Sequence, residues 1–482
     1  MITRRRLLAS SLSAAAAPII LGQANRRPNI VFILADDHAY DFMGNAGHPF
    51  LKTPNLDRLA ANGVRFDNAF VTTSLCSPSR ASILTGQYAH SHGVLDNSTE
   101  LPAQLPNFAQ VLQKQGYRTA LMGKWHMGGE SDEPRPGFDR WVSFRGQGAY
   151  LNPTINFDGQ RRQINGYVTQ ILTDEAVRFA DENKDRPFLL YLGHKAAHAD
   201  FIPEEKYKSL YSTEPIPYPR SMADTAENYR GKPEWVRRQR NSWHGVDGMY
   251  NHRINFEQYY RDYCRVVQSL DDSVGRVYDE LGRRGILENT LIIYMGDNGL
   301  QFGQHGLIDK RTMYEHSIRV PMIAHYLKLL QGGRKVKEMA LNIDICPTIL
   351  QAAGAPIPQT VQGRSLMPLL QGRTDNWRTE FLYEYFWERD YPQTPTVLGL
   401  RTDRYSFMNY HGPWTGDELY DLQADPEQMN NLLGDVPLGT ASGGFFQSIP
   451  AGPVKELVRD LTARRNRILQ ETGGRPEPRW SR

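Results

Sequence analysis

Two short acidic motifs in this sequence, Asp36-Asp37 and Asp297-Asn298, could together hold a metal ion. Each motif directly follows a run of apolar residues, where a buried strand is expected to end. The carboxyl ends of parallel strands meet at one edge of a sheet, where open α/β proteins bind ligands. Four oxygen donors at such an edge favour Ca²⁺ or Mg²⁺ over zinc. One acidic pair is usually a solvated turn or a helix cap, but two such clusters in one chain predict a site for a hard divalent cation.

A second chemical motif begins at Cys76, in the segment Cys76-Ser-Pro-Ser-Arg80, and continues as far as Leu-Thr-Gly86. This segment resembles the signature of the type I sulfatases of the alkaline phosphatase superfamily. In that family, a formylglycine-generating enzyme oxidises the cysteine to Cα-formylglycine. The alternative is that Cys76 is only a buried cysteine that caps a Ser-Pro turn. That alternative does not explain why the similarity to the family continues beyond Arg80. The resemblance implies that residue 76 is both the nucleophile and a metal ligand, and that Arg80 holds it in place.

The chemistry of a hydrated aldehyde explains why this modification is useful. Its single carbon carries two hydroxyl groups, so one can attack the sulfur of a sulfate ester, and loss of a proton from the other later expels sulfate. A divalent cation would lower the pKa of the attacking hydroxyl and hold a sulfate oxygen. Residue 76 and the acidic motifs are therefore expected to share one site.

Two further segments resemble sulfatase motifs that face the sulfate group. The segment 116–126 resembles the second family signature and supplies Lys124 and His126, although it carries a methionine where the family mostly has a smaller or branched residue. In His194-Lys-Ala-Ala-His198 the family often has Lys-Ala-Pro-His, which aligns His198 with the catalytic histidine. An alanine replaces the usual proline in this segment, so His194 stays open as the alternative.

The segment from Gly303 to Glu315 resembles the family's stretch that carries a sulfate-binding lysine. Here that residue is Lys310, and His305 is expected to be a further substrate contact. The roles that the resemblance implies are charge stabilisation by Arg80, Lys124 and Lys310, protonation of the leaving oxygen by His198, and proton removal by His126 or Asp297.

Buried strands must carry these residues to one edge of a sheet. Continuous apolar runs at 28–35, 187–192 and 290–295 predict strands that are covered on both faces. Alternation of strands with helices predicts an α/β fold with a mostly parallel sheet flanked by helices. Residues 203–253, rich in Tyr, Pro, Arg and Trp, are expected to form a long insertion. The expected helices cover residues 55–62, 79–85, 105–115, 170–183 and 256–283.

The pattern changes after residue 365. Strand-like runs at 380–387, 398–410 and 418–422, followed by a helix at 453–472, predict a smaller α+β domain on an antiparallel sheet. The resemblance covers nearly the whole chain after its first residues, and it implies the alkaline-phosphatase-like α/β fold. The expected division is a signal peptide at 1–24, a catalytic domain at 25–365 and a C-terminal domain at 366–482.

The first 24 residues have the features of an export signal. Three arginines, Arg4 to Arg6, precede two leucines and a short alanine-rich apolar run that ends near small residues. Paired arginines predict a twin-arginine signal and an exported protein, either periplasmic or secreted. The alternative is a membrane anchor, but the apolar run is short for a bilayer, so no stable membrane insertion is expected. These arginines also account for the formal charge of +3, and a neutral remainder gives no reason to expect nucleic acid as a partner.

The motifs together predict an enzyme that hydrolyses an organic sulfate ester. Segments 241–247 and 308–311 are similar to polysaccharide and glycosaminoglycan sulfatases, including the N-acetylglucosamine-6-sulfatase group, so a sulfated carbohydrate is the expected substrate. One alternative is a phosphodiesterase or phosphonate monoester hydrolase of the same superfamily, since some of these enzymes share the Cys-x-Pro-x-Arg motif. A binding protein that has lost catalysis is disfavoured because every expected catalytic position is filled.

Overall fold

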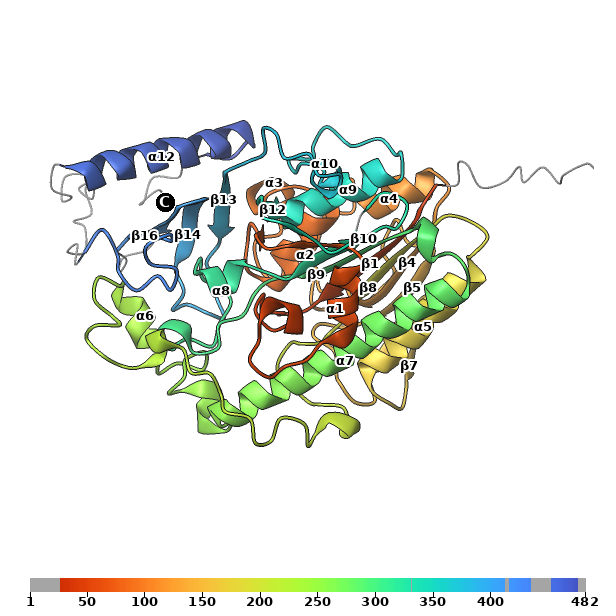
Figure 1. The fold of residues 1–482 in the computed structure, drawn as a ribbon, viewed down its shortest axis with the longest axis horizontal. Coiled ribbons are helices and arrows are strands. Elements are labelled where there is room, and N and C mark those ends of the chain that lie inside the picture. The colour runs from red at the N-terminus through yellow and green to blue at the C-terminus, as the bar shows by residue number, and fades with distance from the viewer. Residues whose placement is uncertain (1–26, 331, 412–415, 435–451, 476–482) are drawn as a thin grey trace, which may run out of the picture.

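Two main β-sheets organise the chain in the computed structural model, which describes residues 27–330, 332–411, 416–434 and 452–475. A ten-stranded sheet forms the larger part, and a four-stranded sheet follows it in the sequence (Figure 1). The expected signal peptide lies outside the described residues, so the twin-arginine assignment stays a prediction. None of the helices in the described ranges combines the length and apolar character needed to cross a membrane.

The large sheet is mixed and mostly parallel. Its strand order is β11-β2-β10-β9-β1-β8-β4-β5-β6-β7, and the five central strands from β9 to β5 all run parallel. The three strands expected from apolar runs are β1, β8 and β9, which are neighbours, and the expected fold class is confirmed. The strands are β1 (Asn29–Ala35), β2 (Val64–Phe66), β4 (Arg118–Lys124), β5 (Arg140–Phe144), β6 (Thr154–Phe157), β7 (Gln160–Gln163), β8 (Phe188–Gly193), β9 (Thr290–Gly296), β10 (Met322–His325) and β11 (Arg334–Val336). A separate ribbon pairs β3 (Ala69–Phe70) with β12 (Ala340–Leu341).

Helices cover both faces of this sheet. Phe32 and Leu34 of β1 belong to one buried core, whereas Val31 and Ile33 belong to the other. Figure 1 shows α5 and α7 across one face, with α2, α4 and α9 on the opposite side. Burial on both faces explains why the central strands are continuously apolar. The helices are α1 (Pro54–Ala61), α2 (Cys76–Thr85), α3 (Ala89–His92), α4 (Phe108–Lys114), α5 (Val168–Glu182), α7 (Phe256–Arg283), α8 (Glu315–Ile318), α9 (Ile345–Ala352) and α10 (Met367–Leu370).

Local capping sets the ends of two helices near the site. Helix α7 has the expected bounds because the side chain of Asn255 accepts hydrogen bonds from the N–H groups of Glu257 and Gln258. Helix α2 begins earlier than the expected residue 79. Its third residue is Pro78, which is tolerated there because the first N–H groups of a helix have no partner within the helix. Cys76 is therefore the first residue of a helix rather than part of a preceding loop.

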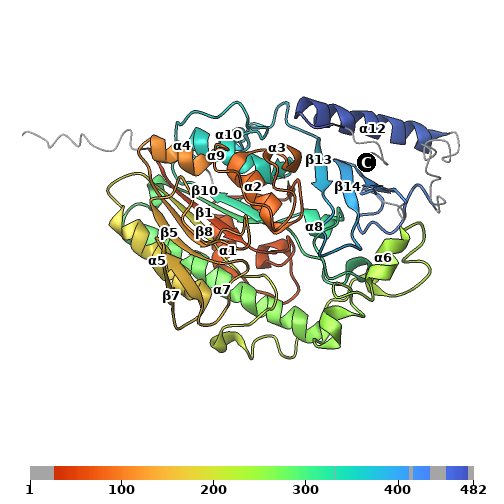
Figure 2. The same ribbon diagram turned by 180° about the vertical axis from the view of Figure 1, so that it is seen from behind.

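The second sheet is antiparallel, as expected, and α12 (Pro453–Glu471) contacts two of its strands (Figure 2). The run at 398–410, expected as one strand-like stretch, is a hairpin of two strands. The turn is stabilised by Thr402, whose hydroxyl oxygen accepts from the N–H groups of Arg404 and Tyr405. The domain division at residue 365 stays a prediction. The strands are β13 (Glu380–Tyr385), β14 (Thr396–Thr402), β15 (Tyr405–His411) and β16 (Glu418–Asp421).

The segment 203–253 contains short helices. Its helices are η2 (Glu205–Tyr207), η3 (Arg220–Met222), α6 (Glu234–Gln239) and η4 (Met249–His252). Lys232 of this segment donates to the hydroxyl of Tyr420 on β16 over 2.8 Å. The segment thus contacts the second sheet, and it also contacts the stretch that follows β9, where Gly245 pairs with Leu307.

Candidate active site

The two acidic motifs meet where β1 and β9 end. The register pairs Ala35 with Gly296, so the residues that follow each strand start at the same level of the sheet. Carboxylate oxygens of Asp36, Asp37 and Asp297 lie within 4.8 Å of one another, and all three residues are buried. The amide of Asn298 donates to Asp37 Oδ1 over 2.6 Å. The structure therefore brings the four expected oxygen donors together.

The electrostatics of this cluster suit a cation. Burial and the neighbouring charge of Asp36 raise the pKa of Asp297 to about 7, because three carboxylates in one buried place repel one another. The amide oxygen of Asn298 is buried and has no hydrogen-bond partner among the described residues. A divalent cation would offset the repulsion and provide a partner for this oxygen. The donor set consists of hard oxygens, so the residues fit Ca²⁺ or Mg²⁺.

Cys76 lies in the same cluster, at the start of α2 and fully buried. Its thiol donates to Asp36 Oδ1 over 3.4 Å, and the ammonium of Lys310 donates to its sulfur over 3.0 Å. Burial and the charge of Asp36 raise the pKa of the Cys76 thiol to about 12. An unmodified cysteine here would be a neutral thiol, which is a poor nucleophile.

Arg80 lies one turn further along α2 and is fully buried. Its Nε donates to Asp297 Oδ2 over 2.9 Å, and one terminal nitrogen donates to the backbone oxygen of Lys124 over 2.9 Å. The guanidinium therefore ties the acidic cluster at the end of β9 to the end of β4. Through these contacts it positions Asp297 relative to residue 76.

Two buried lysines balance the first acidic motif. Lys124, the last residue of β4, contacts Asp36 and donates to the side-chain oxygen of Gln147 over 2.6 Å. Lys310 donates to Asp37 Oδ1 over 2.5 Å. Burial works against the charged form of Lys310, but Asp37 outweighs it and holds the pKa of the lysine well above its usual value. The ammonium group of Lys310 is therefore available as a fixed positive charge.

Two histidines border the cluster. The ring of His126 lies 3.3 Å from the hydroxyl of Ser77, and burial, assisted by Lys124, lowers its pKa well below the usual value. His198 lies with Nε2 3.7 Å from Asp37 Oδ2, while its Nδ1 is 2.6 Å from the backbone oxygen of Ala199. Burial and the charge of Lys310 lower the pKa of His198 well below its usual range. Burial therefore disfavours the charged form of both rings.

Two other histidines from the expected motifs lie elsewhere. His194 is fully buried, and its Nε2 lies 2.9 Å from the hydroxyl of Ser273 on α7, so His198 is the member of this pair that lines the cleft. His305, expected as a substrate contact, does not line the cleft. Its backbone is left-handed, with φ 59°, and its buried ring packs on Tyr314 at 4.1 Å between centroids. The turn at this residue directs the ring towards the second sheet.

A cleft of about 340 Å³ opens above this cluster. Asp37, His198 and Lys310 lie at its base, and aromatic side chains of Trp243 and Tyr391 line it further out. Sequence reasoning singled out the segment that contains Trp243 but not Tyr391. It also missed Asn97 and Gln147, two further lining residues, because isolated amides in loops carry no local signal.

Arg311 connects the outer parts of the cleft. Its guanidinium carbon lies 3.4 Å from the centroid of Tyr391, and the group pairs with Asp309 at 3.0 Å and Glu388 at 2.7 Å. The ring of Tyr391 stacks in turn on His244, with 4.9 Å between centroids. Segments 239–244 and 388–394 therefore meet at the mouth of the cleft, although they are far apart in the sequence.

Comparison with known proteins gives two family matches. The family described as "Sulfatase" matches residues 28–355, and the family described as "N-sulphoglucosamine sulphohydrolase, C-terminal" matches residues 303–440. The first match includes all the side chains of the cluster at the end of β1 and β9. The second includes Lys310 and all four strands of the small sheet.

Individual relatives agree with these families. The chain is 33% identical to an N-acetylglucosamine-6-O-sulfatase of Bacteroides thetaiotaomicron, over 89% of this chain and 86% of the relative. It is 27% identical to a multifunctional alkaline phosphatase superfamily protein of Trinickia caryophylli, over 90% and 97% of the two chains. A solved structure, described as a complex with its substrate D-glucosamine-2-N,6-O-disulfate, superposes with a TM-score of 0.80 at 28% identity, covering 93% of this chain and 98% of the other.

Proposed function

Since the chain belongs to the sulfatase family, we propose that it hydrolyses a sulfate ester on a carbohydrate, with a 6-sulfated N-acetylglucosamine unit as the preferred substrate. The observation that carries the proposal is the buried cluster in which Cys76, Lys310 and the acidic motifs converge. The names of the similar sulfatases, several of which act on sulfated glucosamine, support the choice of sugar.

A bound divalent cation and the oxidation of Cys76 would complete the site. Asp36, Asp37, Asp297 and Asn298 would hold Ca²⁺, or Mg²⁺, which when bound supplies positive charge for a sulfate oxygen and acidifies a nearby hydroxyl. Cys76 would be oxidised to Cα-formylglycine, which supplies the nucleophilic hydroxyl that a neutral thiol with a pKa of about 12 does not.

The fixed side chains bind and orient the sulfate group. Lys310 contacts residue 76 directly and Lys124 contacts the neighbouring Asp36, and both would face sulfate oxygens as negative charge develops in the transition state. Arg80 keeps Asp297 in place by its hydrogen bond. These charges are already paired and buried before substrate arrives, so little reorganisation is needed during the reaction.

Proton transfers are assigned to His198, His126 and Asp297. The hydrogen bond from Nδ1 of His198 to Ala199 leaves Nε2 as the atom that would carry a proton to the leaving alcohol. The negative charge of a bound sulfate ester would favour the charged ring that this step needs. The carboxylate of Asp297, or the ring of His126, whose charged form is disfavoured by burial, would accept the proton from the nucleophile.

Oxidation of Cys76 would come before folding and export of the chain. A twin-arginine route carries folded proteins, so a formylglycine-generating enzyme would have to act on Cys76 in the cytoplasm, before α2 is buried. The mature enzyme would then be periplasmic or secreted. Full burial of Cys76 in the folded chain supports this order of events.

Kinetics with matched esters test the proposal. We expect N-acetylglucosamine 6-sulfate to be hydrolysed with a higher kcat/KM than N-acetylglucosamine 6-phosphate or a phosphonate monoester. A Cys76→Ala protein prepared in parallel measures the background from contaminating enzymes. The opposite order of kcat/KM would support the phosphodiesterase or phosphonate hydrolase alternative. The similarity to the multifunctional alkaline phosphatase superfamily protein of Trinickia caryophylli is the reason to test this alternative.

A further inference from the structure

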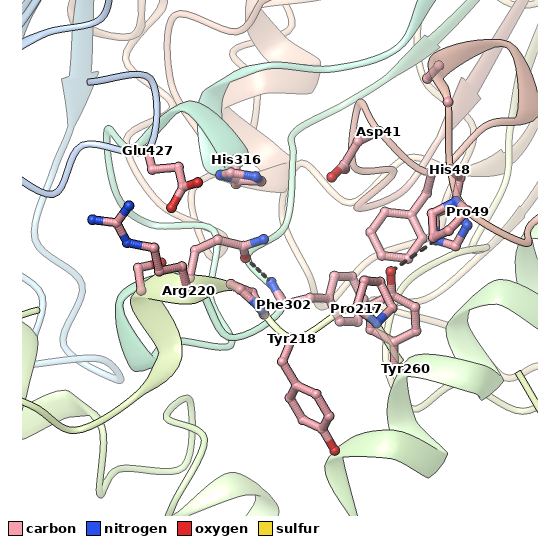
Figure 3. A pocket seen from close by; sticks show the side chains of 16 residues that line it. Asp41, His48, Pro49, Pro217, Tyr218, Arg220, Tyr260, Phe302, His316 and Glu427 are labelled. Atoms are coloured by element: carbon pink, nitrogen blue, oxygen red, sulfur yellow. Dashed lines mark hydrogen bonds between the residues drawn. The ribbon is translucent and has the colours of Figure 1, made fainter. Parts of the chain in front are cut away.

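A second pocket of about 480 Å³ lies near the catalytic cleft (Figure 3). Among the residues that the structure describes, the two hollows share no lining side chain. The second pocket is bordered by the loop after β1, by residues 217–221 of the inserted segment, by the start of α7 and by the loop that follows β16. Its volume lies in the range of small-molecule binding sites, roughly 300–1,000 Å³.

An aromatic partition separates the two hollows. The ring of Phe302 lines the second pocket and lies 6.0 Å from the ring of Tyr259, which lines the catalytic cleft. Phe302 also packs on Phe42 at 4.9 Å and on Tyr260 at 5.4 Å, and both of these rings line the second pocket. The second pocket therefore has an apolar wall of its own and is not an extension of the catalytic cleft.

Polar groups occupy the opposite side of this pocket. Figure 3 shows Asp41, His316 and Glu427 along one side, with Arg220 next to Glu427. One carboxylate oxygen of Asp41 is buried and has no hydrogen-bond partner among the described residues. A buried acceptor without a partner costs free energy, so this oxygen is suited to a hydroxyl or amide donor brought by a ligand.

The charges exclude some classes of ligand. The lining carries two carboxylates and one guanidinium, and burial lowers the pKa of His48 to about 4 and that of His316 below its usual value, which disfavours the charged form of both rings. The net charge of the lining is therefore negative and disfavours sulfate or phosphate groups. A lone metal ion is also a poor match, because the pocket is far larger than an ion and Arg220 adds an opposing positive charge.

A sugar ring without charged substituents matches both sides. Its hydroxyl groups both donate and accept, as carboxylates and a guanidinium require, and its C–H faces pack on aromatic rings such as Tyr260. We propose that this pocket is a second saccharide-binding site that holds an unsulfated hexose or N-acetylhexosamine unit. The ligand is either a free sugar or an unsulfated unit of a longer chain, and the observations that support this site are separate from those that support the proposed hydrolytic reaction.

Calorimetry with glucose, galactose and N-acetylglucosamine tests the site on the full-length protein. We expect at least one of them to bind, and we expect Glu427→Gln and Arg220→Ala each to weaken that binding about tenfold, the effect of losing one hydrogen bond to a charged group. Glu456→Gln, at an exposed carboxylate on α12, is the matched control and should leave binding unchanged. Hydrolysis of a monosaccharide sulfate should be the same in all three variants.

A second experiment, the measurement of KM, distinguishes a free sugar from a unit of a longer chain. If the pocket holds a unit of a longer chain, Glu427→Gln raises KM for a sulfated oligosaccharide and not for the sulfated monosaccharide; if it holds a free sugar, KM is unchanged for both. Failure of all three sugars to bind would overturn the proposal, as would binding that Glu427→Gln and Arg220→Ala leave unaltered. Neither result affects the proposed hydrolase function, because turnover is measured separately and His198→Ala should slow hydrolysis of the sulfated sugar strongly while preserving sugar binding.

Discussion

The ammonium nitrogen of Lys310 lies 3.0 Å from the sulfur of Cys76, inside a cage of buried carboxylates. Such a cage suits oxygen better than a thiol. We therefore expect active protein to carry Cα-formylglycine at position 76. Mass spectrometry of the peptide spanning this residue should show loss of the thiol mass and an aldehyde that reacts with hydrazides.

Cys264 and Cys346 serve as internal controls for this measurement, since both are buried cysteines outside the site and should keep their thiols. Cys76→Ala should fold and bind substrate but not turn it over. Fully active enzyme with an alkylatable thiol at position 76 would contradict the mechanism.

Loss of the metal site should abolish activity. Asp297→Ala removes one member of the cage and the partner of Arg80, and preorganised charges of this kind commonly contribute a factor of about a hundred or more to kcat. A chelator should inactivate the wild-type protein, and Ca²⁺ or Mg²⁺ should restore it. Metal content and kcat are measured together, and a metal-free variant with near-normal kcat would remove Asp297 from the site.

The role of His198 should depend on the leaving group. General acid catalysis contributes about a hundredfold or more where the leaving oxygen needs a proton, so His198→Ala should slow hydrolysis of sugar sulfates strongly. Hydrolysis of an aryl sulfate with a phenolate leaving group should fall much less. His194→Ala is the comparison: it removes the contact with Ser273, so we expect a lower melting temperature without this dependence on the leaving group. Equal losses for both ester types in His198→Ala would argue against an acid role.

A pH-dependent contact joins the second sheet to α3. Burial disfavours the charged form of His90, but its hydrogen bond to Glu384, at 2.6 Å, raises its pKa above the usual value. This contact stabilises the fold below the unfolded pKa of about 6.5, and the contribution is lost as pH rises through the higher folded pKa. The melting temperatures of wild type and His90→Gln should therefore differ more at about pH 6 than at about pH 9. A difference that is constant or larger at high pH would show that His90 is not charged in the fold.

Export can be tested at the paired arginines. Replacing Arg4 and Arg5 with lysine should block transport through a twin-arginine route and leave active enzyme in the cytoplasm. Fractionation followed by sulfatase assay measures the distribution, with a protein of known location as the marker. Unchanged export, or export through the general secretory route, would contradict the assignment.

Local patterns in the sequence were enough to place the centre of the site. Asp36 and Asp297 each follow an apolar run, and buried strands of this kind can be recognised from the sequence alone. Gln147 and Tyr391 could not be found in this way, because their positions depend on contacts with Lys124 and Arg311, which are distant in the sequence. The orientation of the His305 ring could not be predicted from the sequence either, because it depends on the left-handed backbone conformation of this residue.

The pairing of Ala35 with Gly296 has a consequence for how this chain can change during evolution. More than half of the large sheet and the whole inserted segment lie between these two strands in the sequence, yet the strand ladder alone sets the relative heights of Asp36 and Asp297. Loops in between can lengthen, shorten or diverge without moving the catalytic oxygens. Residues 203–253 border both the catalytic cleft and the second pocket. Selection can therefore reshape this segment and alter which sulfated sugars are accepted, while the hydrolytic chemistry is inherited intact.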